Sequence, residues 1–329
     1  MTLNQLRHAI DDADVPSIIS IVQSTGVTLM SQLSLVRQFN AYVMVSDVDY
    51  PTAQIIMDTS GAILTDSAQI NRFGKGILPI ASKYGDFAIT SLITPNTISI
   101  NRSGNRSLLK AARYGHITVL DDLLLRAVNV DFADNNGNTA LILSVKGDSL
   151  ACATSLINAG ADPDIVGQNG MTALALALSL GRTDISNYLI KLTANVNILD
   201  SNDEHGGFET ARNNDATLLS ALISDRLTIE QKNKQGRTML SEAAITGAID
   251  TVRVLVNAGA NLDTTDNALR TPLIYSTVGG KIGIVILLLY PPLGGTGADI
   301  SLVDINGKTA ADYAADYDRQ QIAGLIGDV

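Results

Sequence analysis

Several residue types are scarce in this sequence of 329 residues. It has no tryptophan, one cysteine, three histidines and only 4% aromatic residues. The single Cys152 excludes an internal disulfide framework and a cysteine-based zinc site. The histidines, His8, His116 and His205, are spread too widely for a histidine-rich metal motif. We therefore expect no metal and no other cofactor.

Basic residues and long apolar runs are scarce too. The chain has 23 basic and 33 acidic residues, a net charge of −10, which argues against general binding of nucleic acids or anionic membranes. The most apolar run, residues 282–293, contains Gly283 and is far shorter than the roughly 20 residues that span a bilayer. The first residues show no basic region followed by an apolar core, so we expect no secretory signal. These features predict a cytoplasmic protein, located in the host-cell cytoplasm if it is an effector.

A 33-residue period organises the chain. Segments that open with threonine or an equivalent residue begin at residues 106, 139, 172, 238, 271 and 309, at spacings of 33, 33, 66, 33 and 38. The spacing of 66 hides one degenerate repeat. A glycine stands nine residues into most repeats, and an apolar pair follows. This pattern predicts a short helix, a glycine turn at positive φ, a second helix with one buried stripe, and a polar loop. No such repeat buries its apolar face alone, so neighbours must stack.

The same residues carry a family resemblance. Thr271-Pro272-Leu273 opens one repeat, and Gly160-Ala161-Asp162 and Gly259-Ala260-Asn261 close second helices. From about residue 103 to 329, the sequence resembles the ankyrin-repeat family, although no repeat keeps the histidine that follows Thr-Pro-Leu in that family. The resemblance implies an all-α solenoid of nine to ten helix-turn-helix repeats with short finger loops. It also implies a concave face that binds protein partners, and a structural role for His116 after Gly115.

The repeats differ in clarity along the chain. Residues 1–102 are expected to form an N-terminal cap and divergent repeats, the last of which starts near residue 77 and has a shortened finger. Residues 103–305 contain the clear repeats, with the degenerate repeat at 202–234 and a five-residue insertion near 291–295. Residues 306–329 are expected to form a C-terminal capping repeat.

Four segments suggest chemistry, and each has a structural alternative that we favour. Gly307-Lys308-Thr309 lacks the earlier glycine of a P-loop and coincides with a repeat start. Gly294-Gly295-Thr296-Gly297 is a candidate phosphate cradle, but a flexible insertion at the finger fits it better. Residues 202–205 hold candidate metal ligands but are typical of a solvated acidic loop, and Cys152 reads as a buried structural thiol. Because no catalytic constellation stands out, we expect no enzyme activity.

Charge is distributed unevenly. Residues 73–146 carry eight basic and five acidic residues, whereas residues 147–329 carry 12 and 21. Lys83-Tyr84 and Arg113-Tyr114 occupy the same two positions of successive repeats, and Lys110 lies one helical turn before Arg113. Lys146 is placed at the tyrosine position of the next repeat, and Arg102 and Arg106 in the loop before the Lys110 helix. We call these residues the basic–aromatic patch: Lys83, Tyr84, Arg102, Arg106, Lys110, Arg113, Tyr114 and Lys146.

The patch has a simpler interpretation, in which it is a solvated face whose tyrosines pack between repeats. A second candidate surface, the finger with Lys232, Lys234 and Arg237, has no aromatic residue. We predict a non-catalytic protein that recognises a partner protein as an adaptor or effector, to sequester or recruit it. Two alternatives are a fixed subunit of a larger assembly and an acidic inhibitor that imitates nucleic acid. No membrane and no direct nucleic-acid partner are expected.

Overall fold

The computed structural model describes residues 78–93, 101–126, 128–192 and 195–327. The chain divides into two compact bodies, an N-terminal body that ends at Asp162 and a C-terminal body that begins at Pro163. The N-terminal cap and the first divergent repeats that the sequence predicts lie outside the described residues. Within the described residues there are helices and loops and no β-strand, which confirms the all-α fold class.

Paired helices make up the described part of each body. In the N-terminal body, residues 78–84 are helical and are followed by α7 (Phe87–Ile93), α8 (Asn101–Tyr114), α9 (Ile117–Leu124), α10 (Ala140–Lys146) and α11 (Leu150–Asn158). The C-terminal body begins with a short 3-10 turn, η2 (Gln168–Gly170), and continues with α12 (Ala173–Ser179), α13 (Thr183–Lys191), α14 (Gly207–Arg212), α15 (Ala216–Ser224), α16 (Met239–Thr246), α17 (Ile249–Asn257), α18 (Pro272–Val278), α19 (Ile282–Leu289), α20 (Ala310–Asp316) and α21 (Gln320–Gly327). No helix among these residues is long and apolar enough to cross a membrane.

Threonine side chains start the first helix of the clear repeats. In each case the threonine backbone is extended and its hydroxyl oxygen accepts the backbone N–H three residues later, which satisfies an otherwise unpaired helix donor. The five capping residues are Thr139, Thr172, Thr238, Thr271 and Thr309. Five of the six repeat starts predicted from the sequence are therefore helix starts, whereas the sixth, at Arg106, lies inside α8.

A residue in the left-handed region reverses the chain between the paired helices. Gly115 has φ +74°, and Gly247 has φ +85°. In the repeat that lacks this glycine, Asp148 adopts φ +55° at the same position. The predicted positive-φ turn is thus confirmed, and it persists even where the residue has a side chain.

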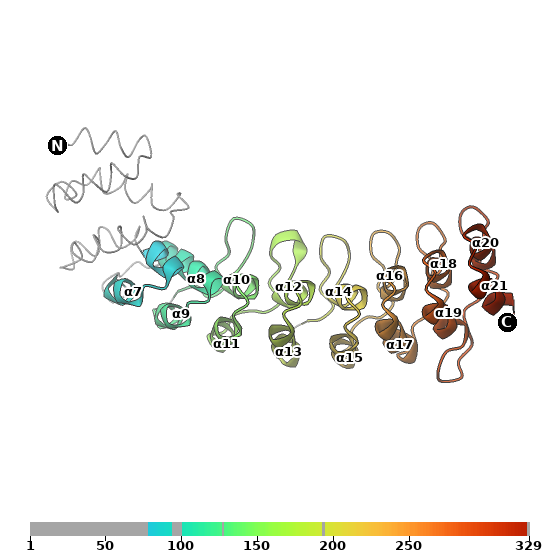
Figure 1. The fold of residues 1–329 in the computed structure, drawn as a ribbon. Coiled ribbons are helices and arrows are strands. Elements are labelled where there is room, and N and C mark those ends of the chain that lie inside the picture. The colour runs from blue at the N-terminus through green and yellow to red at the C-terminus, as the bar shows by residue number, and fades with distance from the viewer. Residues whose placement is uncertain (1–77, 94–100, 127, 193–194, 328–329) are drawn as a thin grey trace, which may run out of the picture. The chain divides into compact units, whose positions relative to one another are not determined.

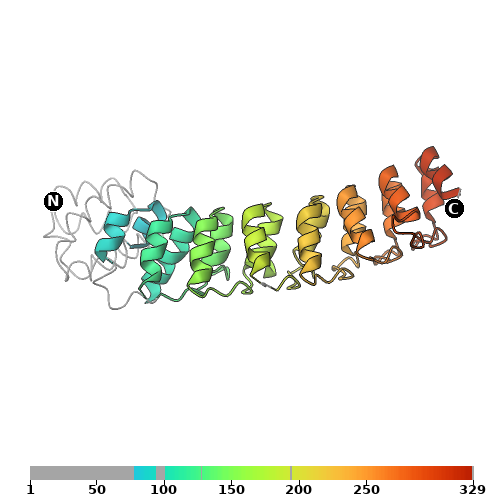
Figure 2. The ribbon, with the colours of Figure 1, turned by 90° about the horizontal axis from the view of Figure 1, so that it is seen from below.

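Helices of the same kind pack against one another within each body. In the N-terminal body α8 contacts α10, and α9 contacts α11. In the C-terminal body the first helices α12, α14, α16, α18 and α20 form one row and the second helices form another, as Figures 1 and 2 show. Leucine and alanine side chains fill the space between the rows, with Leu141, Leu240 and Leu273 at most 1% exposed. Each repeat therefore buries its apolar stripe against its neighbours.

The fingers are closed loops that also bind one another. In the finger after α15, the backbone N–H of Asn233 donates to the carbonyl of Arg237 (2.9 Å). The next residue, Lys234, donates its N–H to the carbonyl of Asn202 in the preceding finger (3.0 Å). Asn267 and Ile305 repeat this bond in the two following fingers. The fingers of the C-terminal body are thereby held in register from one repeat to the next.

Two predicted loop placements are wrong. Arg102 and Arg106 lie in α8, which begins at Asn101, and not in a loop before it. Ser103 and Asn105 are buried, and Ser107 donates its hydroxyl to the Ser103 carbonyl (2.8 Å). Burial of this turn outweighs the preference of asparagine, serine and glycine for loops.

The second wrong placement is the insertion near 291–295. It follows the second helix α19, on the side of the stack away from the fingers (Figure 1). Pro291 and Pro292 stop α19, and the N–H of Ala298 donates back to the carbonyl of Leu288 (2.9 Å). The inserted residues therefore form a loop between the end of α19 and the turn at Ala298. The finger that follows keeps its usual length.

Candidate functional site

The basic residues of α8 lie along one side of the helix. Arg106, Lys110 and Arg113 are four and three residues apart, a spacing that places side chains on one helical face. The opposite side of α8 is core, since Leu108 and Ala112 are fully buried. Arg106 and Lys110 are partly exposed and Arg113 is exposed. The side chains of Arg106 and Arg113 make no hydrogen bond or ion pair with the described residues.

Lys83 joins the tyrosines of two successive repeats. Its Nζ atom lies 5.1 Å from the ring centroid of Tyr84 and 5.9 Å from that of Tyr114. Both distances are within cation–π range. Tyr114 is 44% exposed. The structure therefore brings together the lysine and the two tyrosines that the repeat register places side by side.

His116 holds the turn that follows Lys83 and Tyr84. Its Nε2 lies 2.8 Å from the carbonyl oxygen of Lys83, and since a carbonyl only accepts, Nε2 is the donor. The ring also occupies the space beside Gly85, where an added Cβ would lie 2.5 Å from Nδ1. The predicted structural role of His116 is confirmed: it fixes the turn that carries Lys83 and Tyr84.

Two members of the basic–aromatic patch stand apart. Lys146 does not occupy the tyrosine position. Gly115 and Asp148 are the equivalent left-handed residues of two successive repeats, so Lys146 is equivalent to Arg113 and not to Tyr114. The Lys146 Nζ lies 3.4 Å from the Asn138 side-chain oxygen, at the base of the finger that precedes α10. Arg102 belongs to the first turn of α8, and its side chain lies outside the described part of the structure.

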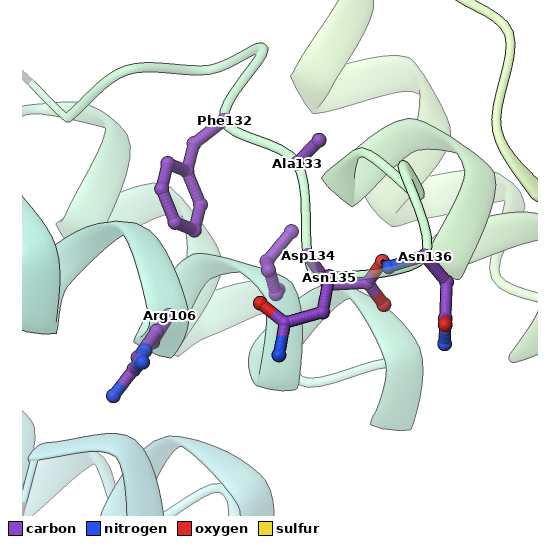
Figure 3. A pocket seen from close by; sticks show the side chains of 7 residues that line it. Arg106, Phe132, Ala133, Asp134, Asn135 and Asn136 are labelled. Carbon is purple, nitrogen blue, oxygen red and sulfur yellow. Dashed lines mark hydrogen bonds between the residues drawn. The ribbon is translucent and has the colours of Figure 1, made fainter.

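A groove between α8 and the finger 132–138 adjoins the patch. It encloses about 460 Å³ and is lined by Arg106, Leu109, Phe132, Ala133, Asp134, Asn135 and Asn136. Figure 3 shows Phe132 and Asn135 extending from the finger toward the helix that carries Arg106. Sequence reasoning missed Phe132 and the two asparagines as site residues, because finger residues have no periodic signature.

The one carboxylate of the groove is occupied by its own finger. The Asp134 Oδ1 atom accepts the backbone N–H groups of Asn136 and Asn138, each at 2.9 Å. The Asn138 side-chain amide also donates to this carboxylate (3.2 Å). Asp134 therefore shapes the finger, while the guanidinium of Arg106 makes no ion pair with the described residues.

A second polar cluster, absent from the sequence-based prediction, lies in the C-terminal body. Arg212 bonds to Glu204 (2.5 Å), Glu209 (3.1 Å) and Glu242 (3.1 Å), from its own repeat and the next. Arg237 continues the series to Glu242 (3.5 Å). We call these five residues the arginine cluster. Arg237 of the second candidate surface therefore belongs to the arginine cluster, and Lys232 Nζ donates to the Thr265 carbonyl (2.8 Å), while Lys232 and Lys234 are exposed.

Asp304, in the finger before α20, is a further buried carboxylate of the C-terminal body. Burial disfavours the charged form of Asp304, but hydrogen bonds from the Tyr313 hydroxyl (2.6 Å) and the Lys308 N–H (3.1 Å) outweigh it and lower the pKa of Asp304 to about 2. The residues Gly307-Lys308-Thr309 are thus a finger base and a helix cap. Cys152 is buried in α11, where burial raises the pKa of its thiol, as expected of a structural residue.

His205 replaces the capping threonine in the degenerate repeat. Its Nε2 donates to the Thr228 carbonyl (3.0 Å), and its Nδ1 accepts the N–H of Gly207 at the start of α14 (3.2 Å). The ring is 2% exposed and neutral. Burial lowers its pKa, opposed by backbone hydrogen bonds and the Glu204 carboxylate. Both nitrogens are used in hydrogen bonds, so residues 202–205 present no imidazole to a metal.

A pH-dependent contribution to stability follows from this lowered pKa. Above the unfolded-state value of about 6.5, histidine is neutral in both states and the contribution is complete. As the pH falls from there through the folded-state pKa, the unfolded chain gains the proton first and the contribution is lost. We expect the wild type to lose more stability between pH 7.5 and pH 5 than His205→Gln, which keeps a donor for Thr228. Urea denaturation at both pH values measures this, and equal losses would contradict it.

Comparison with known proteins gives one family match. A family model described as ankyrin repeats (3 copies) matches residues 108–200 and 208–304, which together are more than half of the chain. The matched segments contain helices α9–α13 and α15–α19 and four of the five capping threonines, Thr139, Thr172, Thr238 and Thr271. Both matched segments fall in the region where the sequence shows the period most clearly.

Individual relatives are similar over part of their length. The chain is 29% identical over 122 residues to "Dauer abnormal formation protein 25" of Caenorhabditis elegans, which is 37% of this chain and 30% of that protein. The chain therefore spans less than a third of this curated relative. Among solved structures, the ankyrin repeat protein EF0377 aligns with a TM-score of 0.53 and 28% identity, over 56% of this chain and 96% of its own.

Proposed function

Because the chain belongs to the ankyrin-repeat family, whose repeats generally mediate protein–protein interaction, we propose that it binds a partner protein through the basic–aromatic patch. One observation carries the proposal. Lys83 lies between the rings of Tyr84 and Tyr114, on the side of the stack where Arg113 is exposed and makes no ion pair with the described residues. The contact of Lys83 with two tyrosine rings, and the exposed Arg113 next to Tyr114 in the chain, support this proposal.

The composition and the rigidity of this surface favour binding. Tyrosine and arginine are the residue types that most often dominate interface energetics. The Lys83 Nζ atom lies within cation–π range of both rings, and the bond from His116 to the Lys83 carbonyl holds the backbone of this turn. A surface that is already ordered loses little side-chain entropy when a partner binds.

We propose that binding alone is the activity, and that the protein is an adaptor or effector that sequesters or recruits its target. Ankyrin-repeat proteins are typically non-enzymatic, and we propose no catalysis here. A reducing compartment suits the single buried thiol of Cys152, so we propose that the protein works in the cytoplasm.

Imitation of nucleic acid is the weaker explanation of the acidic C-terminal body. A mimic needs carboxylates that present their charge to the partner. Glu204, Glu209 and Glu242 instead bind Arg212, and Asp304 accepts the Tyr313 hydroxyl. These four carboxylates are therefore engaged in bonds within the protein and are poorly placed to present their charge to a partner.

Partner capture tests the proposal. The wild type and the triple variant Lys110→Glu, Arg113→Glu, Tyr114→Ala are used to capture proteins from an extract of the source cells, which are identified by mass spectrometry. The variant is expected to lose at least about 90% of a partner that the wild type retains, since hot-spot truncation costs about 2 kcal/mol or more. Circular dichroism confirms that the variant is folded.

A matched control excludes a general effect of charge. Lys191→Glu, Arg226→Glu, Tyr290→Ala makes the same changes at exposed residues of the C-terminal body and is expected to retain the partner. If the folded patch variant keeps the same partner as the control, the patch is a solvated face and the proposal is wrong. Recovery at a fixed stoichiometry would point to a permanent subunit.

A further inference from the structure

The groove beside α8 combines two kinds of lining. Leu109 and Phe132 give it apolar walls, and Arg106 stands at its edge. The exposed side-chain amides of Asn135 and Asn136 complete the finger side. Apolar walls with a few polar groups are typical of sites that take one or two side chains, and the volume of about 460 Å³ fits that size.

The walls are held in place before any ligand arrives. Asn105, buried in α8, accepts the backbone N–H of Asn129 at 2.9 Å with its side-chain oxygen. The N–H of Phe132 donates to the carbonyl of Asn129 (3.1 Å), and Asp134 closes the finger tip. The finger is therefore tied to the helix on which Arg106 and Leu109 stand, and the groove is preformed.

The charge of the groove selects its ligand. The carboxylate of Asp134 is occupied by the N–H groups of Asn136 and Asn138, whereas Arg106 makes no ion pair with the described residues. Lys110 and Arg113 extend the positive charge along α8. Since an arginine fork matches a carboxylate, a negatively charged group is the complementary ligand.

We propose that this groove binds an acidic segment of the partner protein. A glutamate or aspartate carboxylate of that segment binds the guanidinium of Arg106, and a neighbouring apolar side chain packs against Leu109 and Phe132. The amides of Asn135 and Asn136 bind the peptide backbone. This inference rests on the proposed function, because it names the kind of partner that the same face of the N-terminal body recognises.

Selection from a phage-displayed library of random 12-residue peptides tests the inference on the full chain. Enriched peptides are expected to contain an acidic residue beside leucine, phenylalanine or tyrosine. The best peptide, labelled with fluorescein, is then titrated by fluorescence anisotropy. Replacing its acidic residues with their amides is expected to weaken binding at least about tenfold, because the charged hydrogen bond to Arg106 is lost. Binding should also weaken as NaCl rises from 50 to 300 mM.

Variants of the protein locate the peptide. Arg106→Glu and the milder Arg106→Gln are expected to weaken binding about tenfold or more, and Phe132→Ala by a similar factor, while Lys191→Glu leaves it unchanged. The inference is wrong if the library enriches no peptide, if the enriched peptides lack acidic residues, or if the folded Arg106 variants bind as well as the wild type. If the peptides fail while the patch variant still loses its cellular partner, the proposed function stands and only the chemistry of the partner is wrong.

Discussion

Gly147→Ala is expected to lower the free energy of unfolding of the N-terminal body by about 3 kcal/mol. Gly147 follows α10 with φ −82°, a conformation that alanine adopts without strain. Backbone conformation alone would therefore make this change neutral or slightly stabilising. The opposite is expected here, because a Cβ at this position would lie 2.2 Å from the carbonyl oxygen of Arg113.

The neighbour in this clash is backbone, which cannot rotate away as a side chain can. Relief requires the end of α10 to move away from the end of α8, where Arg113 and Tyr114 stand. The change should then also weaken partner binding. Urea denaturation followed by circular dichroism at 222 nm measures the loss, which suits a chain without tryptophan.

Gly160→Ala is the matched control in the same body. Gly160 has φ +90° and open space where a Cβ would lie, so only backbone strain is expected, at about 1 kcal/mol. An equal loss of stability in the two variants would show that the close approach of α10 to α8 does not limit residue 147.

The repeat architecture could be predicted because each local signal recurs. One threonine before an apolar run is a weak sign of a helix start, but five at the same register are not, and all five cap helices. The alignment of Lys83 with Tyr84 and Tyr114 across a repeat boundary follows from the same register. Stacking converts a fixed sequence spacing into spatial contact, so residues at equivalent positions become neighbours.

Features that depend on one particular environment could not be predicted. The start of α8 at Asn101 depends on the burial of Ser103 and Asn105, which residue preferences do not register. Proline and glycine mark the insertion as a loop, but they do not say at which end of the repeat it lies. In the sequence Phe132 resembles any other finger residue, and only the fold shows that it lines the same groove as Leu109.

The arginine cluster is the clearest case of this limit. Arg212, Glu204 and Glu242 come from three different positions of two repeats, so no fixed spacing relates them. In the sequence they only add to the counts of charged residues. In the folded chain they are an internal charge network, with the Glu204 and Glu242 side chains 11% and 9% exposed.

Arg212→Met is accordingly expected to destabilise the C-terminal body by about 3 kcal/mol, because it leaves mostly buried carboxylates without their main partner. Burial disfavours the charge of Arg212, but bonds to Glu204 and Glu242 outweigh this and raise its pKa, so it is charged at every accessible pH. The Asn233 side-chain amide still donates to Glu204 (2.7 Å) and Arg237 still reaches Glu242 (3.5 Å), which keeps the loss below the top of the usual range.

An exposed ion pair of the same body provides the control. Arg253 lies 3.3 Å from Asp250, and both side chains are 51% exposed, so Arg253→Met should cost less than about 0.5 kcal/mol. The double variant Arg212→Met, Glu242→Gln should be less destabilised than the two single losses added together, since removing one charge relieves the other. Losses from Arg212→Met and Arg253→Met that agree within about 0.5 kcal/mol, measured by urea denaturation, would show that burial does not strengthen the cluster. The two expected losses of stability differ by roughly 2 kcal/mol or more. A measured difference of that size would show that the arginine cluster, which sequence reasoning missed, holds the degenerate repeat in the stack.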